Sequence, residues 1–203
     1  MKARRDKILD VAVALAEEGG FDNVRQRDVA AKAGVALGTL YKSFRSKEDI
    51  LTAALDREAE MLERRMEAKP AVGANRIERA GTFFNIITRG LCRKPKYARA
   101  VLRAMASGEP EVALKVAAYQ ERITGLIIAA MRGVGRLAYS DAKGSPPSKK
   151  EAQMAFALQQ FWFATLVGWS AGLVSVNEAV EQMRRIAIVL DRGIDDDKPE
   201  KSR

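Results

Sequence analysis

Apolar residues recur three and four positions apart along most of the chain, which is the spacing of one face of an α-helix. The pattern predicts nine helices, at about residues 4–18, 26–33, 37–44, 46–67, 75–91, 95–106, 111–132, 148–173 and 175–190. No segment shows the sustained alternation of apolar and polar residues that a half-buried strand requires. The chain is therefore expected to adopt an all-α fold.

Glycines and capping motifs mark where these helices begin and end. Gly19-Gly20 should end the first helix and Gly34 the second, because glycine tolerates the left-handed conformation at a helix C-terminus. Ser148-Lys149-Lys150-Glu151 and Ser175-Val176-Asn177-Glu178 are capping boxes, in which serine and glutamate side chains bind free backbone N–H groups. Ser46-Lys47-Glu48-Asp49 resembles them, with aspartate in place of the glutamate.

Two segments lack helical periodicity. Gly133–Ser148 contains three glycines and the pair Pro146-Pro147, which predicts a loop with a tendency to disorder. The tail from Asp195 to Arg203 alternates in charge and is expected to be disordered.

Residues 26–44 form the segment with the clearest functional pattern. Two short helices are joined by a tight turn at Gly34, with Val29 and Ala30 facing inward on the first helix and Leu37, Leu40 and Tyr41 on one face of the second. This is the pattern of a helix-turn-helix, whose second helix enters the major groove of DNA. Spacing alone leaves a second interpretation open, because two short helices of any α-bundle look similar.

The polar residues of this segment favour DNA. Side chains that donate hydrogen bonds occur at Gln26, Arg27, Thr39, Lys42, Arg45 and Lys47. No acidic residue lies between Val29 and Lys47, so nothing on the second helix repels phosphate. A recognition helix must present donors to phosphates and base edges in this way.

Composition narrows the function classes further. The chain has 203 residues and a net charge of +9, which favours anionic partners without identifying one. It has no histidine, which removes the commonest general base and zinc ligand. Cys92 is the single cysteine, so no internal disulfide can form, and it is expected to be a small residue of the core or of its boundary. We predict no enzyme activity, no cofactor and no metal site.

One uncharged stretch raises the question of a membrane. Ala152–Asn177 contains no charged residue and is long enough to span a bilayer, but it includes Gln153 and Gln159-Gln160. A helix buried at a subunit interface explains it better, with close-approach positions at Ala155, Ala164, Gly168, Ala171 and Gly172. The first apolar run is interrupted by Asp10, unlike a secretory signal. The chain is therefore predicted to be a cytoplasmic homodimer without a membrane contact.

Residues 4–55 resemble the N-terminal domain of the TetR family of bacterial transcriptional regulators. The resemblance rests on RDVAAKAGVALGTLYKSFRSKEDIL, residues 27–51, which contains the start of the second helix, the Ala-Gly-Val turn and a Gly-Thr-Leu-Tyr recognition helix. It implies an all-α homodimer that acts as a ligand-responsive regulator, a repressor released from a palindromic DNA operator by a small hydrophobic effector. The implied division is a DNA-binding domain at 1–50, an effector-binding and dimerisation domain at 51–195 and a disordered tail at 196–203.

The resemblance also implies which residues contact DNA. Phosphate contacts fall on Thr39, Tyr41, Lys42 and Lys47, contacts along the groove on Leu37 and Gly38, and contacts to backbone or base edges on Gln26 and Arg27. Tyr41 could instead belong to the core of the small domain, and Phe44 is expected there. The chain departs from the family at Arg25 and Ala36, where hydroxyl side chains usually cap the two helices.

Within the family, GVALGTLYKSF, Gly19-Gly20 and the tryptophan-containing eighth helix resemble the KstR-type repressors of sterol catabolism. That resemblance implies an acyl or steroid thioester of coenzyme A as effector. A basic stretch fits it independently, because residues 68–110 hold nine Lys and Arg against two Glu. It includes Arg89, Arg93, Lys94, Lys96, Arg99 and Arg103, which could bind coenzyme A phosphates or form a solvated face. The alternative is a regulator of efflux or stress genes that responds to another lipophilic or cationic ligand.

An effector cavity for such a ligand should be apolar. The candidate lining residues are Phe83, Phe84, Ile87, Leu102, Met105, Tyr119, Ile123, Leu126, Ile127, Trp162, Phe163, Leu166 and Trp169, with Arg89 and Arg93 for the charged end. Trp162, Leu166 and Trp169 share one helical face, although aromatic residues at this spacing also form plain core. An all-α enzyme and a helical interaction protein without an effector are the competing function classes.

Overall fold

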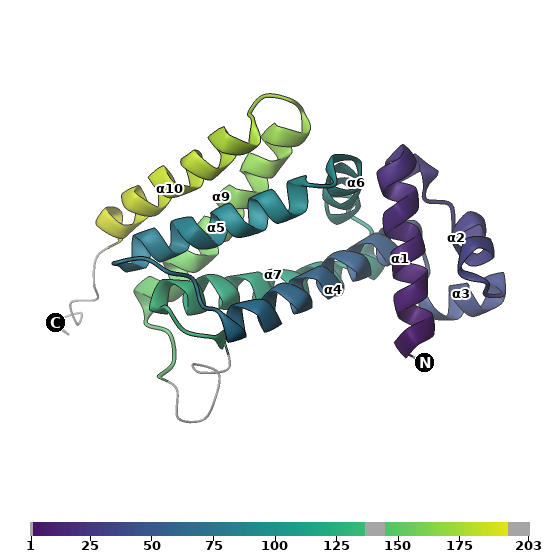
Figure 1. Cartoon of the computed structure of the whole chain (residues 1–203), viewed down its shortest axis with the longest axis horizontal. Coiled ribbons are helices and arrows are strands. Elements are labelled where there is room, and N and C mark those ends of the chain that lie inside the picture. Colours follow the sequence, from purple (N-terminus) through teal and green to yellow (C-terminus); the bar gives the residue numbers. More distant parts are fainter. Residues whose placement is uncertain (1, 137–144, 195–203) are drawn as a thin grey trace, which may run out of the picture. The chain divides into compact units, whose positions relative to one another are not determined.

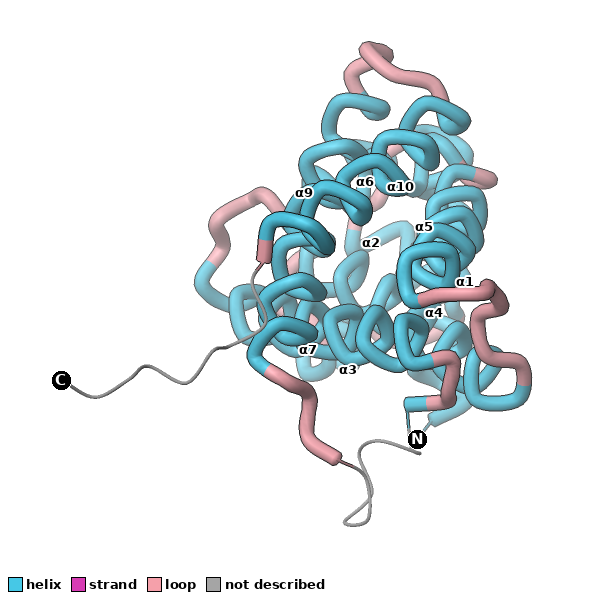
Figure 2. The backbone as a smooth tube through the Cα atoms, turned by 90° about the vertical axis from the view of Figure 1, so that its left-hand side faces the viewer, coloured by secondary structure: helices cyan, strands magenta, loops and turns pink. Residues whose placement is uncertain are grey.

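The computed structural model describes residues 2–136 and 145–194. Within these ranges the chain forms nine α-helices and one short 3-10 helix, joined by loops and with no strand (Figures 1 and 2). The helices are α1 Lys2–Gly19, η1 Phe21–Asn23, α2 Gln26–Ala33, α3 Leu37–Ser43, α4 Lys47–Ala68, α5 Arg76–Cys92, α6 Pro95–Met105, α7 Pro110–Arg132, α9 Lys149–Ser170 and α10 Val176–Gly193. The prediction of an all-α fold is confirmed.

Predicted and observed helix boundaries agree to within about three residues. The largest differences are that α9 ends at Ser170 and that α10 continues to Gly193. The Leu173 N–H donates to the Gly168 carbonyl at 3.0 Å, which closes a turn where the apolar sequence had suggested more helix. Gly20 has φ 74° and ψ −162°, so the φ after α1 is positive as predicted but ψ is not that of the left-handed helix.

The capping boxes at Ser148 and Ser175 are both present with reciprocal side-chain bonds, as predicted. At the start of α4 the pattern is altered. The Asp49 N–H donates to Ser46 Oγ at 3.1 Å, while the Asp49 carboxylate accepts from the N–H of Arg45 at 3.0 Å. The predicted disorder of the tail and of the middle of the Gly133–Ser148 loop concerns residues outside those described.

The described residues divide into two compact units. The first comprises the residues up to Glu60 and Leu91–Tyr119. In it, α1 packs against α2 and α6, and α2 packs against α3. Arg57 of α4 donates to the Asp6 carbonyl at 3.0 Å and to the Asp10 carboxylate at 2.7 Å, which fixes the middle of α4 to α1.

The second unit comprises Met61–Gly90 and the described residues from Gln120 onward. In it α9 and α10 pack against each other as a helical hairpin (Figure 1). The indole N–H of Trp162 donates to Thr88 Oγ1 at 3.0 Å, and its ring lies 6.3 Å from the ring of Phe84. No helix in the described ranges combines the length and apolar character that a bilayer span needs.

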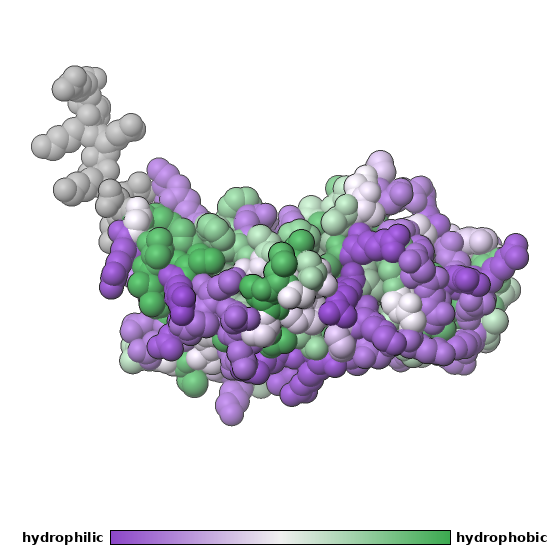
Figure 3. Space-filling view, turned by 90° about the horizontal axis from the view of Figure 1, so that it is seen from above, coloured by the Kyte–Doolittle hydropathy of each residue, from purple (hydrophilic) through white to green (hydrophobic). Residues whose placement is uncertain are grey.

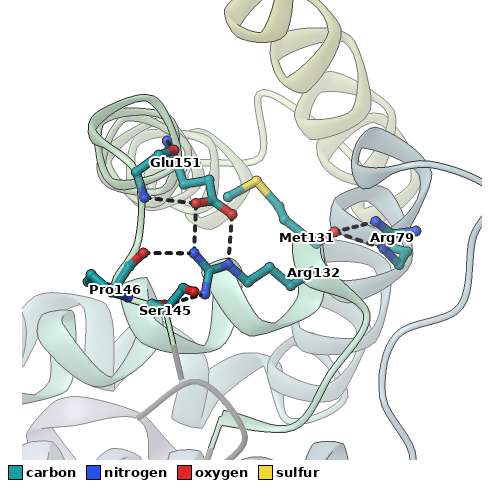
Figure 4. Close-up of polar contacts among 7 residues, drawn as sticks. Arg79, Met131, Arg132, Ser145, Pro146 and Glu151 are labelled. Carbon is teal, nitrogen blue, oxygen red and sulfur yellow. Dashed lines mark hydrogen bonds and ion pairs between the residues drawn. The ribbon is translucent and has the colours of Figure 1, made fainter. Parts of the chain in front are cut away.

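Two arginines fasten the C-terminal end of α7 within the second unit (Figure 4). Arg132 makes a two-pronged ion pair with Glu151, with both N–O distances 2.8 Å, and also binds the carbonyls of Ser145 and Pro146. Arg79 donates twice to the Met131 carbonyl, at 2.8 and 2.6 Å. Hydrogen bonds from the Arg132 side chain lower the pKa of Glu151 to about 2, against a smaller effect of burial.

Candidate nucleic-acid interface

The turn between α2 and α3 forms around Gly34, as the sequence predicts. Gly34 has φ 68° and ψ 38°, the left-handed conformation. Its N–H donates to Ala31 O at 3.1 Å, and the N–H of Val35 donates to Ala30 O at 3.0 Å. This pair of bonds is a Schellman C-cap, which lets the chain reverse directly into α3.

The angle of α3 is held by Gln26, a predicted DNA contact. Its side-chain amide donates to the Phe44 carbonyl at 3.2 Å and so joins the start of α2 to the end of α3. Phe44 is fully buried, with the guanidinium of Arg5 4.7 Å from its ring centroid. Phe44 is therefore a core residue, as predicted. Gln26 has a structural role as well, because its hydrogen bond holds α3 in place against the start of α2.

The outer face of α3 carries the remaining predicted contacts. Leu40 is buried and anchors the helix, whereas Tyr41 is 48% exposed, so the alternative of a core position for Tyr41 is wrong. Gly38 and Lys42 are exposed, and so is Arg27 on α2. Leu37 and Thr39 are half-buried. The outer face of α3 therefore presents hydrogen-bond donors and small side chains, and α3 contains no acidic residue.

Both departures from the family's caps lie at the expected positions. Arg25 and Ala36 are the N-cap residues of α2 and α3, and neither makes a side-chain capping bond. The first N–H groups of both helices therefore lack the side-chain acceptor that serine or threonine supplies.

Lys47 lies beside Asp22 and Phe21, two contacts that the sequence did not predict. Its ammonium lies 3.5 Å from Asp22 Oδ1 and 4.0 Å from the centroid of the Phe21 ring, and its side chain is 28% exposed. Arg103 of α6 binds the same carboxylate at 3.1 Å and lies 4.2 Å from the same ring. The hydrogen bond from Arg103, helped by the nearby Lys47 charge, lowers the pKa of Asp22. Lys47 thus has an acidic partner that a phosphate must displace or share.

The six basic residues of the 89–103 stretch are split between the two units. Arg89 lies in the second unit and donates to Asn85 and Asn177, each at 2.7 Å. The other five lie in the first unit, where Lys96 binds the Glu18 carbonyl at 2.8 Å and Arg103 binds Asp22. Arg93 is exposed. At least three of the six therefore take part in contacts within the protein.

Most predicted effector residues are buried in their own unit. In the second unit these are Phe83, Phe84, Ile87, Ile123, Leu126, Ile127, Trp162, Leu166 and Trp169; in the first they are Leu102 and Tyr119. Met105 and Phe163 are half-buried. Trp162, Leu166 and Trp169 share the buried face of α9, and the indole of Trp162 already has a partner, which agrees with a core role. Within the described ranges no three side chains gather as a metal site requires.

One of the positions predicted to pack against a second copy, on α9 and in the turn that follows it, is wrong. Ala155 is fully buried inside its own unit, so it cannot contact a second copy. Ala164, Ala171 and Gly172 are exposed and Gly168 is half-buried. A helix apolar on more than one face gives no sequence signal for which stripe faces inward.

Comparisons with known proteins agree with this geometry. The bacterial regulatory proteins of the tetR family match residues 8–54, and the tetracyclin repressor-like C-terminal domain matches residues 73–190. The HTH-type transcriptional repressor KstR of Rhodococcus jostii is 31% identical over 182 residues, which cover 90% of this chain and 80% of the relative.

Two solved structures share the fold. A TetR transcriptional regulator from Rhodococcus sp. RHA1 has a TM-score of 0.79 at 24% identity, covering 95% of this chain and 97% of its own. Thermus thermophilus FadR, solved in complex with lauroyl-CoA, has a TM-score of 0.65 at 18% identity, covering 98% and 99%. At these identities the likeness shows the fold alone.

Proposed function

The chain belongs to the tetR family of bacterial regulatory proteins, and we propose that it is released from a palindromic operator by a coenzyme A thioester of a largely apolar acid. Its family and its similarity to KstR make it a DNA-binding transcriptional repressor of the TetR type. The proposal adds which residues touch the operator, how two copies associate and which ligand class acts on them.

The operator contacts of the proposal rest on the outer face of α3. Buried Leu40 and Phe44 fix the helix from within, which leaves Thr39, Tyr41 and Lys42 on the side that can enter a major groove. The exposure of Tyr41 is the observation that carries this assignment, because a core tyrosine could not reach a phosphate. Gln26, Arg27, Leu37, Gly38 and Lys47 complete the set.

The experiment first selects operator fragments from sheared genomic DNA of the source organism with the purified full-length protein. Lys42→Ala should then weaken binding to the selected fragment and to unrelated DNA alike, because a phosphate contact carries no sequence information. Lys32→Ala is the matched control, since Lys32 lies on α2 and pairs with Glu18 at 3.7 Å. Equal losses in both variants would contradict the assignment.

In the proposed homodimer, each copy would use the uncharged outer face of its α9 together with exposed apolar residues of its α10. Phe156 and Val167 are 59% and 45% exposed on one stripe of α9, and Val189 of α10 is 67% exposed. Figure 3 shows apolar residues gathered on this side of the second unit. Exposed apolar area of this kind is typical of an interface, and a four-helix arrangement of two hairpins would cover it.

Four observations of different kinds support the proposed effector. The sequence resembles KstR-type repressors, and the structural neighbour FadR binds lauroyl-CoA. The chain holds a basic stretch in which Arg93 is exposed, a charge that suits phosphate groups. The proposal places the hydrocarbon part of the ligand among the buried apolar side chains of the second unit, such as Trp162, Leu166 and Trp169.

Mass spectrometry of small molecules that co-purify with the protein tests the ligand class without prior choice. Thermal unfolding with lauroyl-CoA, lauric acid and coenzyme A then separates the parts of the ligand. A larger shift with the thioester than with either part supports the proposal, because binding to the native state alone raises the melting temperature. An equal shift with the free acid would show that the basic residues do not bind the phosphates.

A further inference from the structure

Two ion pairs within the first unit join the start of α7 to the turn that follows α3. Arg45 Nη1 lies 3.2 Å from Glu111 Oε1, and Lys115 Nζ contacts Asp49 Oδ1. Glu111 and Lys115 are four residues apart on α7, and Arg45 and Asp49 are also four residues apart. The acid comes first on α7 and the base comes first on the other segment. Opposite charges at matched spacing fix one register between the two segments.

Asp49 is the residue on which this connection depends, because its side chain is bound from both directions. It is 4% exposed. One carboxylate oxygen accepts from the N–H of Arg45 at 3.0 Å, and the other accepts from Lys115. A buried carboxylate has lost the water that would stabilise its charge, so it needs a partner of opposite charge. Lys115 supplies that charge from α7.

The turn that Asp49 holds leads directly back into α3. Phe44, the C-cap residue of α3, is fully buried, and its N–H donates to the Leu40 carbonyl at 2.8 Å. The ammonium of Lys115 lies 5.8 Å from the centroid of the Phe44 ring. Lys115 therefore acts on both neighbours of Arg45 in this structure: on Asp49, which binds the Arg45 N–H, and on Phe44, which ends the helix.

We propose that Lys115 is a positioning residue for operator recognition. Through Asp49 it holds the end of α3 in the orientation that binds the operator, and Glu111 supports it through Arg45. We call these two ion pairs the α7 latch. The inference rests on the proposed function in that the outer face of α3 reads the operator.

The α7 latch also gives a route by which the rest of the chain acts on α3. The helix α7 runs from Pro110 to Arg132, so it begins in the first unit and continues in the second. A shift of its first two turns that separates Lys115 from Asp49 would release the end of α3 and weaken operator binding.

Fluorescence anisotropy with the full-length protein compares the selected operator fragment with unrelated DNA of the same length. Removal of a positive charge weakens both complexes alike, whereas loss of positioning weakens only the operator complex, so the ratio of the two binding constants is the readout. Lys115→Met should lower this ratio about tenfold for each bound copy, the lower end of what one charge-assisted hydrogen bond contributes. Lys115→Arg should retain the ratio. Lys94→Met, at an exposed position before α6, is the charge-matched control that should also retain it.

A double variant separates positioning from stability. Lys115→Met leaves the buried Asp49 charge without its partner on α7, so the melting temperature should fall. Asp49→Asn removes that charge, while its amide oxygen can still accept from the Arg45 N–H. The double variant should therefore regain most of the melting temperature and still have the low ratio, because the connection to α7 is lost. Glu111→Gln should have a smaller effect, since its ion pair is exposed to solvent.

Hydrogen exchange of the free protein tests the α7 latch without any DNA. In the double variant, whose overall stability is regained, the amides of residues 40–46 should exchange faster than in the wild type, and those of α10 should not. An unchanged ratio in Lys115→Met, a ratio that the double variant restores, or unchanged exchange at residues 40–46 would overturn the latch. A wild-type protein that selects no operator fragment would contradict the proposed function instead, and the exchange result would then decide the latch.

Discussion

Lys47→Ala should flatten the salt dependence of operator binding by a defined amount. Each phosphate bound by a lysine contributes about 0.9 to the slope of log K against log salt, so removing Lys47 from both copies of a dimer should lower the slope by about 1.8. Between 50 and 200 mM salt, the wild-type binding constant should then fall about twelvefold further than that of the variant. The weakening should be similar on selected and unrelated DNA.

The structure adds a second variant with the opposite effect. Lys47 lies 3.5 Å from the Asp22 carboxylate, which must release or share it when a phosphate arrives. Asp22→Asn should therefore tighten operator binding, most at low salt, where screening is weakest. Most of this gain should vanish in the double variant, because the two side chains act on one interaction.

The assay is fluorescence anisotropy of a labelled operator with wild type, both single variants and the double variant at four salt concentrations. Circular dichroism checks that each variant keeps its helices, and Lys32→Ala serves as a charge-matched control. An unchanged slope in Lys47→Ala, or weaker binding by Asp22→Asn, would refute the reasoning.

Three further variants test other parts of the account. Gly34→Ala should destabilise the protein by about 1–2 kcal/mol in urea unfolding, because its φ of 68° strains any side chain, even though an added Cβ would meet Lys7 Nζ only at an ordinary contact distance of 3.6 Å. Glu151→Gln should cost about 1–2 kcal/mol at pH 7 after solvent screening. Since the folded-state pKa is lowered, to about 2, this difference should be present above about pH 4.3 and shrink as the pH falls toward 2 in unfolding measured at several pH values. Phe156→Glu should give monomers in sedimentation velocity, and a dimer of unchanged stability would contradict the α9 interface.

The helices were predictable because their signals are local. Apolar periodicity, Gly34 and the serine capping boxes act over a few residues, so they determine helix boundaries whatever packs around them. The helix-turn-helix was predictable for the same reason. The end of α9 was not, because Ala171-Gly172-Leu173 continues an apolar run and gives only a weak stop.

The surroundings of the candidate sites depend on contacts distant in sequence. Lys47 meets Asp22 and Arg103, which lie on other elements and leave no pattern near position 47. Ala155 was misplaced because α9 is apolar on more than one face. The ion pair between Lys115 and Asp49 could be recognised only once α7 was seen to lie beside the start of α4.

The most direct test of the account is a titration of the preformed complex between the protein and its selected operator. Fluorescence anisotropy would follow the DNA while lauroyl-CoA, lauric acid or coenzyme A is added, with a steroid thioester as a fourth ligand. A thioester should release the operator at lower concentration than its free acid, and coenzyme A alone should release none. A ligand acts only through its different affinities for the two conformations. An operator complex that none of the thioesters dissociates would contradict the central claim.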